Sequence, residues 1–202
     1  MDYVISLGRR QRKRQAVHER VLEVADQLFR ERGIGGTTVE DIAEGADVAR
    51  QTVFNHFPYK EALAVELVAD DVQTVALRAQ ALLEAETPAL EVLYRTAEWL
   101  LESAIAQGEL GTVVARELLH PDRERASRAA QPMPLREMFE AILVQAREEG
   151  AVRENLELDV VAARISAILT TMMAQILVCD AQQIRREFVV CFDILFHGIT
   201  DR

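Results

Sequence analysis

The chain has 202 residues, of which 50% are hydrophobic and only 5% aromatic, a composition that favours helices over a sandwich of short strands. Its two cysteines, Cys179 and Cys191, have neither the number nor the spacing of a disulfide scaffold or a zinc site. No long apolar segment follows the charges at the N-terminus, so a secretory signal is not expected, and the longest nearly uncharged run, Ile165–Cys179, is too short to span a bilayer comfortably. We therefore expect a soluble, cytoplasmic protein.

The net charge of −10 is distributed unevenly along the chain. Residues 1–63 carry ten basic and ten acidic side chains, so the whole excess of negative charge belongs to residues 64–202. Within the neutral part, the five basic residues between Arg9 and Arg14 are opposed only by Asp2. We call residues 9–14 the basic arm. A basic arm on a neutral N-terminal segment, followed by an acidic remainder of the chain, would orient the molecule toward phosphate groups. A segment that only increases solubility would give the same pattern.

The first expected helix runs from about Gln11 to Arg32, where apolar residues recur at helical spacing and Gly33 supplies the stop. A second, short helix is expected from Val39 to about Gly45. Thr38 precedes it as an N-cap, and Asp41 completes an imperfect capping box.

A third helix is expected from about Arg50 to His56, ending where Pro58 forbids continuation. The turn before it contains Asp47, one of the few residue types that tolerate a left-handed conformation. Two short helices joined by a tight turn and braced by a longer one predict a helix-turn-helix. His56 then belongs to a recognition helix rather than to a catalytic cleft.

The outer face of this third helix has the chemistry of base recognition. Val48, Val53 and Phe57 are expected to point inward, which leaves Arg50, Gln51, Phe54 and Asn55 on or near the outer face. Arg and Gln side chains can read base edges with two hydrogen bonds each.

The sequence from Gln15 to Leu67 closely resembles the N-terminal domain of the TetR (tetracycline-repressor) family of bacterial regulators. The resemblance rests on the apolar-apolar-Phe ending of the first helix, the Thr-Thr cap, the Ile-Ala of the second helix and the run Thr-x-aromatic-x-His-Phe-x-x-Lys. It implies an all-α fold in which a three-helix helix-turn-helix domain with a basic arm, residues 1–63, precedes a larger helical regulatory and dimerisation domain, residues 64–202.

The resemblance also implies roles for individual residues. The hydroxyl and N–H of Thr38 would bind a phosphate, and the major groove would be faced by Arg50, Gln51 and Asn55. Contacts to the sugar–phosphate backbone would come from Thr52, Phe54, His56 and Lys60. Phe54 stands where the family usually has Tyr, and Ala49 replaces the usual Ser or Thr cap, which costs that helix about 1 kcal/mol.

Residues beyond Lys60 are expected to be helical to the end of the chain. The expected helices are Lys60 to about Glu84, Pro88 to about Gln107, Leu110–His120, Leu135 to Glu149, Leu158 to Cys179 and Gln182 to Thr200. The segment Pro121–Pro134 is polar and bounded by prolines, so it is expected to be a loop and the best candidate for mobility.

The last two expected helices are apolar on more than one face, and a helix that is apolar on most sides must bury most sides. A subunit interface is the expected cover, with two helices from each subunit forming a four-helix bundle, as the resemblance also implies. The interface residues predicted on these helices are Met172, Ile176, Phe188, Phe192 and Leu195.

A ligand cavity is predicted in the larger domain, bordered by Tyr94, Trp99, Met138 and Phe139, and suited to a hydrophobic effector. Large aromatic residues on helices also occur as ordinary core, which is the competing interpretation. His120 lies near acidic residues but lacks metal-ligand spacing. No catalytic motif or nucleotide loop occurs in the sequence, so no catalytic site, cofactor or metal is expected.

The sequence therefore predicts a homodimeric transcriptional regulator that binds a double-stranded DNA operator. The resemblance implies that it is a repressor, released from a pseudo-palindromic operator by a small molecule. Two alternatives remain at this point. One is a ligand-independent DNA-binding protein, which would need a basic body, and the other is an enzyme on a helical scaffold, which would need a nucleophile and a base.

Overall fold

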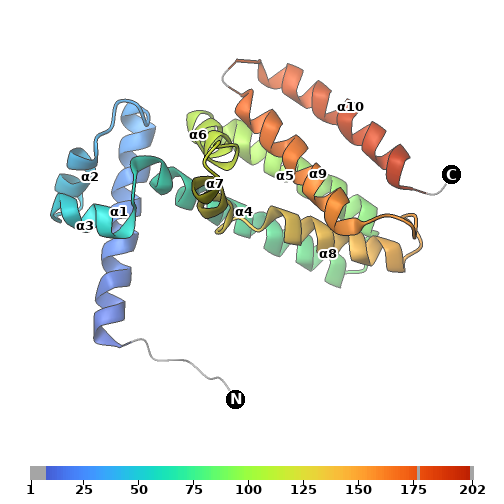
Figure 1. Cartoon of the computed structure of the whole chain (residues 1–202), viewed down its shortest axis with the longest axis horizontal. Helices are drawn as coiled ribbons and strands as arrows, with labels where there is room; N and C mark the ends of the chain where they lie inside the picture. The colour runs from blue at the N-terminus through green and yellow to red at the C-terminus, as the bar shows by residue number, and fades with distance from the viewer. Residues whose placement is uncertain (1–7, 177, 201–202) are drawn as a thin grey trace. The chain divides into compact units, whose positions relative to one another are not determined.

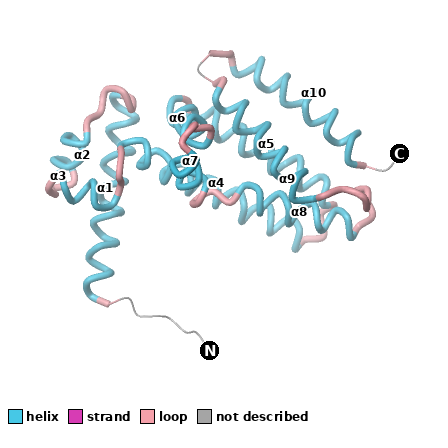
Figure 2. The backbone as a smooth tube through the Cα atoms, viewed as in Figure 1, coloured by secondary structure: helices cyan, strands magenta, loops and turns pink. Residues whose placement is uncertain are grey.

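The computed structural model describes residues 8–176 and 178–200, and within them it contains ten helices and no strand (Figures 1 and 2). The predicted all-α fold with an N-terminal helix-turn-helix is confirmed. The chain divides into two compact units, Met1–Leu67 and Val68–Arg202, which we call unit 1 and unit 2. The division falls inside a helix, slightly after the predicted domain boundary at residue 63.

Unit 1 contains the helices α1 (Arg9–Arg32), α2 (Val39–Gly45) and α3 (Arg50–His56), and the beginning of α4 (Lys60–Glu84). One face of α1 is buried through Val21, Ala25 and Phe29, and the inner sides of the other helices are buried through Ile42, Ala43, Val53 and Phe57. These residues form the small core against which α3 is held.

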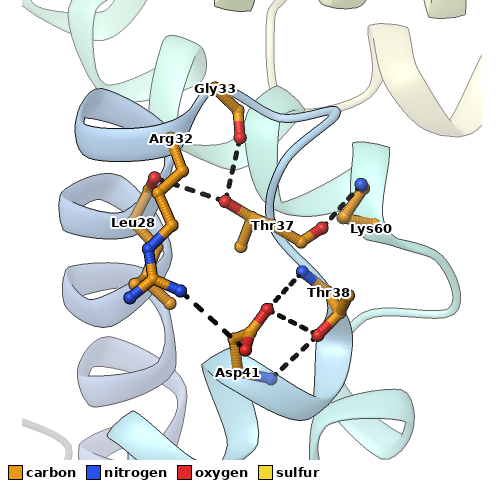
Figure 3. A network of polar contacts seen from close by, with 7 residues as sticks. All are labelled: Leu28, Arg32, Gly33, Thr37, Thr38, Asp41 and Lys60. Carbon is orange, nitrogen blue, oxygen red and sulfur yellow. Dashed lines mark hydrogen bonds and ion pairs between the residues drawn. The ribbon is translucent and has the colours of Figure 1, made fainter.

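The turn between α1 and α2 is fixed by hydrogen bonds (Figure 3). A close approach of the backbone at Gly36 restricts it further. The hydroxyl of Thr37 donates to the carbonyl oxygens of Leu28 and Gly33. A Cβ atom at Gly36 would lie only 2.3 Å from the carbonyl oxygen of Arg32, so this position requires glycine.

The capping box predicted at α2 is present. The Thr38 hydroxyl accepts from the N–H of Asp41, and the Asp41 carboxylate accepts from the N–H of Thr38. The turn that follows α2 contains Asp47 with a φ of 51°, the left-handed conformation that the sequence predicts there. Ala49 caps α3 without a side-chain hydrogen bond, also as expected.

Unit 2 holds the rest of α4 together with α5 (Ala89–Gln107), α6 (Glu109–Leu118), α7 (Arg123–Ala130), α8 (Leu135–Glu148), α9 (Leu158–Ala174) and α10 (Ala181–Ile199). Helices α5, α8 and α9 pack against one another (Figure 1). Their shared core includes Leu93, Leu101, Phe139, Leu143 and Ile165, all no more than 1% exposed.

Helix α10 packs against α5 through contacts between aromatic rings and through one ion pair. The ring of Tyr94 lies 5.6 Å from that of Phe188 and 6.2 Å from that of Phe192. The guanidinium of Arg185 donates two hydrogen bonds of 2.6 Å to the carboxylate of Glu102, which lowers the pKa of that carboxyl group.

The prediction of a loop over Pro121–Pro134 is wrong, because this segment contains the helix α7. The Asp122 carboxylate caps α7 by accepting from the N–H groups of Glu124 and Arg125. The Arg125 side chain also donates two hydrogen bonds, of 2.5 and 2.7 Å, to the buried carboxylate of Glu117 on α6. A cap and a partner on the preceding helix thus stabilise a segment whose composition alone indicated a loop.

Three predicted helix ends also differ from the structure by two or more residues, one of them the end of α6, which lies at Leu118 rather than His120. Helix α9 ends at Ala174 rather than Cys179, and α10 begins at Ala181 with Asp180 as its cap. Helix α1 begins at Arg9 rather than Gln11, so the basic residues of the predicted arm from Arg9 to Arg14 are part of a helix.

Candidate nucleic-acid interface

Helix α3 presents the three side chains predicted to face the major groove. Val53 and Phe57 are 1% and 2% exposed and hold the inner face of the helix in the core of unit 1. Arg50, Gln51 and Asn55 are exposed on its outer face. The predicted backbone-contacting residues on this helix, Thr52, Phe54 and His56, are half-buried along its edges.

The outward-facing side chains of α3 interact with one another and with α2. The Arg50 guanidinium pairs with the Glu40 carboxylate, with Nε 2.9 Å from Oε1, and lies over the Phe54 ring at 5.2 Å. The Gln51 amide donates a hydrogen bond of 3.2 Å to the side-chain oxygen of Asn55. Phe54, which lacks the phenolic oxygen usual at its position, therefore serves as a support for Arg50.

The structure gives Thr38 and Lys60 partners within unit 1 (Figure 3). Both donors of Thr38, its N–H and its hydroxyl, bond to the Asp41 carboxylate, so the groups predicted to bind phosphate are engaged in capping α2. The Lys60 ammonium donates to the carbonyl oxygens of Ile34 and Thr37, which ties α4 to the α1–α2 turn. An ammonium has three N–H donors, so one remains for the phosphate contact predicted for Lys60.

His56 belongs to a cluster of titratable side chains. Its ring lies 5.6 Å from that of His18 on α1, which stacks on Phe57 at 4.7 Å and bonds to the Glu66 carboxylate at 3.0 Å. Partial burial lowers the pKa of His56, electrostatic interactions with His18 and Arg14 lower it further, and Glu66 opposes them. His56 is therefore neutral near pH 7 in the free protein.

A cavity of about 790 Å³ opens in unit 2 among α6, α7, α8 and α9. Leu118, Leu119 and Met133 contribute apolar surface to its wall, and Arg128 and Arg136 add two basic side chains. Both arginines follow Pro121, one on α7 and the other at the start of α8. This lining was not predicted, because most of the segment was expected to be a loop.

The residues predicted to border a ligand cavity are Tyr94, Trp99, Met138 and Phe139. None of these four lines the cavity of unit 2. Tyr94 packs on the rings of α10, and the guanidinium of Arg78 lies over the ring of Trp99 at 5.9 Å. Phe139 is fully buried in the core of unit 2 and Met138 is half-buried. The structure thus places the cavity among other residues.

Three of the predicted interface residues pack inside unit 2, which corrects that assignment. Met172, Phe188 and Phe192 are 5%, 2% and 0% exposed. The other two, Ile176 and Leu195, are half-buried. The exposed apolar side chains of α10 are instead Val189, Val190 and Ile194, at 54%, 58% and 67% exposure.

Comparison with protein families covers both units. The family model for bacterial regulatory proteins of the tetR family matches residues 21–67, and that for the C-terminal domain of TetR/AcrR family transcriptional repressors matches residues 69–198. The chain belongs to the TetR family. The resemblance noted in the helix-turn-helix is therefore confirmed, and it extends through unit 2 of this TetR-family transcriptional repressor.

Relatives of this repressor are themselves transcriptional regulators. The HTH-type transcriptional repressor KstR2 of Mycobacterium tuberculosis (strain ATCC 25618 / H37Rv) is 29% identical over 150 residues, covering 70% of this chain and 72% of KstR2. The HTH-type transcriptional repressor DhaR of Mycobacterium sp. (strain GP1) is 26% identical over 161 residues, covering 74% of this chain and 76% of DhaR.

Two solved structures are similar along nearly the whole chain. FadR of Thermus thermophilus, a TetR-family repressor crystallised with lauroyl-CoA, has a TM-score of 0.81 and 28% identity, covering 92% of this chain and 96% of its own. FadR of Bacillus subtilis, crystallised with stearoyl-CoA, has a TM-score of 0.67 and 18% identity, covering 90% and 99%, and shows the shared fold.

The described parts of this TetR-family repressor contain no group of three or more His, Cys, Asp and Glu side chains that could bind a metal ion. Among the same residues, no helix combines the length and the apolar character that crossing a membrane requires. The relatives that match are regulators rather than enzymes.

We expect the DNA affinity of this TetR-family repressor to rise as the pH falls below about 6.5, the ordinary pKa of histidine. In the predicted backbone contact, a phosphate beside His56 would favour the protonated ring, so the complex would take up a proton that the free protein lacks. The affinity should rise by at most about tenfold for each unit by which the pKa of His56 in the complex exceeds that in the free protein. Fluorescence anisotropy of a labelled operator at a series of pH values measures the change, and His56→Gln should flatten the profile.

The folding stability of the free protein sets the lowest pH at which DNA affinity can be measured. Because the pKa of His56 is lowered in the folded chain, its contribution to stability is present above about pH 6.5 and is lost as the pH falls through the lowered pKa. Thermal melts of the free protein at each pH therefore accompany the binding curves. An unchanged affinity over a range in which unit 1 stays folded would contradict the expectation.

Proposed function

We propose that this TetR-family repressor is a homodimer that binds a pseudo-palindromic DNA operator and leaves it when a fatty acyl-CoA binds to unit 2. The observation that carries the effector class is the likeness to Thermus thermophilus FadR, which extends over nearly all of both chains. That protein was crystallised with lauroyl-CoA.

The cavity of unit 2 suits an amphipathic ligand of this kind. Its volume of about 790 Å³ lies within the range of small-molecule sites, roughly 300–1,000 Å³. Leu118, Met133 and Ala167 offer apolar surface for an acyl chain. Arg128 and Arg136 lie at the same cavity and can donate hydrogen bonds to the phosphates of the CoA moiety.

The DNA part of the proposal rests on α3. Its exposed Arg50 and Gln51 can each make paired hydrogen bonds to a base edge. The excess of acidic residues after residue 63 leaves unit 1 as the part suited to the extended negative charge of a DNA duplex. A two-fold symmetric dimer would place two such helices in successive major grooves.

The exposed face of α10 is the feature that supports a homodimer. Val190 and Ile194 are one helical turn apart and Val189 is adjacent, so together they form an apolar strip. A subunit related by two-fold symmetry would cover the strip with the same strip of its own α10.

Release from the operator would follow from a two-state equilibrium. A ligand that binds unit 2 better in one state shifts the population toward that state, by no more than its difference in affinity between the two. If the favoured state spaces the two recognition helices wrongly for successive grooves, operator affinity falls.

The test uses an operator selected from a random DNA pool and lauroyl-CoA as the probe. We expect micromolar lauroyl-CoA to lower operator affinity by about tenfold or more, a coupling free energy of at least about 1.4 kcal/mol. Coenzyme A and lauric acid, tested separately, should have much weaker effects because each supplies only half of the recognition. Binding of lauroyl-CoA with unchanged operator affinity would instead favour a ligand-independent DNA-binding protein.

We expect Arg128→Ala and Arg136→Ala each to weaken lauroyl-CoA binding by roughly tenfold, because each removes a charge-assisted hydrogen bond to phosphate. Isothermal titration calorimetry measures the change. The matched control is Arg123→Ala, since Arg123 is exposed on the same helix as Arg128 but does not line the cavity. An equal weakening in all three variants would indicate general electrostatic attraction and no specific site.

A further inference from the structure

A second concave surface lies within unit 1, between the beginning of α1 and the edge of α3. It encloses about 970 Å³, and we call it the cationic cleft. Its polar lining comes mainly from Arg10, Lys13 and Arg14 on α1 and from Thr52, Asn55 and His56 on α3. No acidic side chain occurs among the described residues that line it.

The basic side chains of the cleft lie on one face of α1 because they recur at helical spacing. Arg10, Lys13, Arg14 and Val17 follow the pattern i, i+3, i+4 and i+7, which places them on one side of the helix. Arg9 and Arg12 carry the same charge on the same turns but do not line the cleft. The basic segment is therefore an ordered, two-sided helix, with only one side facing α3.

The α3 side of the cleft consists of hydrogen-bonding residues next to the base-reading side chains. Thr52 and Asn55 offer neutral polar groups, and His56 gains a positive charge when it is protonated. The charge of Arg14 acts on His56 across the cleft and helps to lower its pKa. An anionic strand between the two helices would relieve this repulsion between positive charges.

We propose that the cationic cleft holds the sugar–phosphate backbone of one DNA strand beside the bases read by α3, with Arg10, Lys13 and Arg14 contacting its phosphates. The inference rests on the proposed DNA-binding function. It adds a set of contacts from residues that precede the stretch matching the family, which begins at residue 21. These contacts raise affinity for DNA of any sequence and leave base preference to Arg50 and Gln51.

The experiment measures how the affinity of the full chain for the selected operator depends on salt. The slope of log affinity against log salt concentration becomes shallower by about 0.9 for each phosphate that the protein no longer neutralises. The variant R10A/K13A should therefore have a slope about 1.8 shallower than the unmodified chain, with similar decreases in affinity for operator and random duplexes. The control R9A/R12A removes the same charge from the same helix outside the cleft, and its slope should change by less than half as much.

Each outcome has a distinct meaning. If R10A/K13A and R9A/R12A reduce the slope equally, the attraction is a property of the charged helix and the cleft is not a site. If neither changes it, DNA does not reach α1 and the inference is overturned, although specific binding by α3 would stand. If the unmodified chain binds no selected duplex, the proposed function itself fails. All four side chains are exposed, so thermal melts should show that both variants remain folded.

Discussion

Replacing Ile194 with Asp is expected to convert the proposed homodimer to monomers and to lower operator affinity by at least roughly 100-fold. Ile194 is 67% exposed within one subunit, so the substitution leaves the core of unit 2 intact. In the dimer it would bury a carboxylate without a partner near its own symmetry copy, which costs several kcal/mol. A monomer reads half of the operator and loses much of the difference between specific and non-specific DNA binding. Sedimentation velocity at micromolar concentration and anisotropy with the operator measure the two effects.

The matched control for this experiment is Leu77→Asp. Leu77 on α4 is also 67% exposed in unit 2, but it lies outside the strip on α10. This variant should remain dimeric and bind the operator normally. An Ile194→Asp protein that still sediments as a dimer would place the interface on another surface. Phe192→Asp is unsuitable for the test, since Phe192 is fully buried and its replacement would disrupt unit 2 itself.

Replacing Arg125 with Ala is expected to destabilise unit 2 by about 3–5 kcal/mol, because it leaves a buried carboxylate unpaired. The Glu117 side chain is 6% exposed, and Arg125 is the partner that donates two hydrogen bonds to it from α7. A destabilisation of this size lowers the melting temperature of a domain this large by roughly 10 °C. Chemical denaturation followed by circular dichroism measures the free energy of unfolding.

Two further variants separate the ion pair from other effects of the substitution. Arg128→Ala removes an exposed pair with Glu124 from the same helix and should cost less than about 1 kcal/mol. The double variant E117L/R125M removes both charges and should recover most of the stability, since the carboxylate is no longer present. If the double variant is as unstable as Arg125→Ala alone, the buried charge is not the cause.

Several parts of the fold were predictable because their causes lie close together in the sequence. The Thr38–Asp41 capping box, the left-handed Asp47 and the limits of α2, α3 and α4 follow from neighbouring residues. The exposed Arg50, Gln51 and Asn55 follow from the helical spacing of the buried Val53 and Phe57. Local signals of this kind need no knowledge of the rest of the chain.

Other features depend on partners that the sequence does not identify. Helix α7 was missed because Arg125 finds its partner, Glu117, on a different helix, and the buried Ala129 looks unremarkable in a polar segment. The apolar excess of α10 was detected, but periodicity does not say whether a face is covered by the same subunit or by another. Phe188 and Phe192 proved to be internal, on the side facing Tyr94.

The candidate sites also differ in whether neighbouring residues or partners distant in the sequence determine them. The side chains proposed to read bases could be located on the outer face of α3 from the sequence, because one short helix carries them all. The cavity of unit 2 could not be predicted, because its wall is assembled from the ends of α6 and α7, the beginning of α8 and the inner turns of α9. The phosphate role of Thr38 was implied by the family resemblance. The predicted capping box already engages the Thr38 N–H, and the sequence did not show that Asp41 also accepts from the Thr38 hydroxyl.

The contacts that Arg50 and Gln51 make in the free protein have a consequence for how quickly an operator is found. Arg50 is paired with Glu40 and Gln51 with Asn55, so the base-reading groups start in a closed arrangement. On the proposed function, random sequence would offer base edges that do not replace these bonds, and the protein could slide along the duplex held by its phosphate contacts alone. At an operator, paired bonds to the bases would replace them and the side chains would rearrange. In this scheme the search would depend strongly on salt, because phosphate contacts alone would hold the protein on the duplex. The exchange of the exposed Arg50 and Gln51 contacts for bonds to the bases would take on the order of nanoseconds, so it would not delay recognition of the operator.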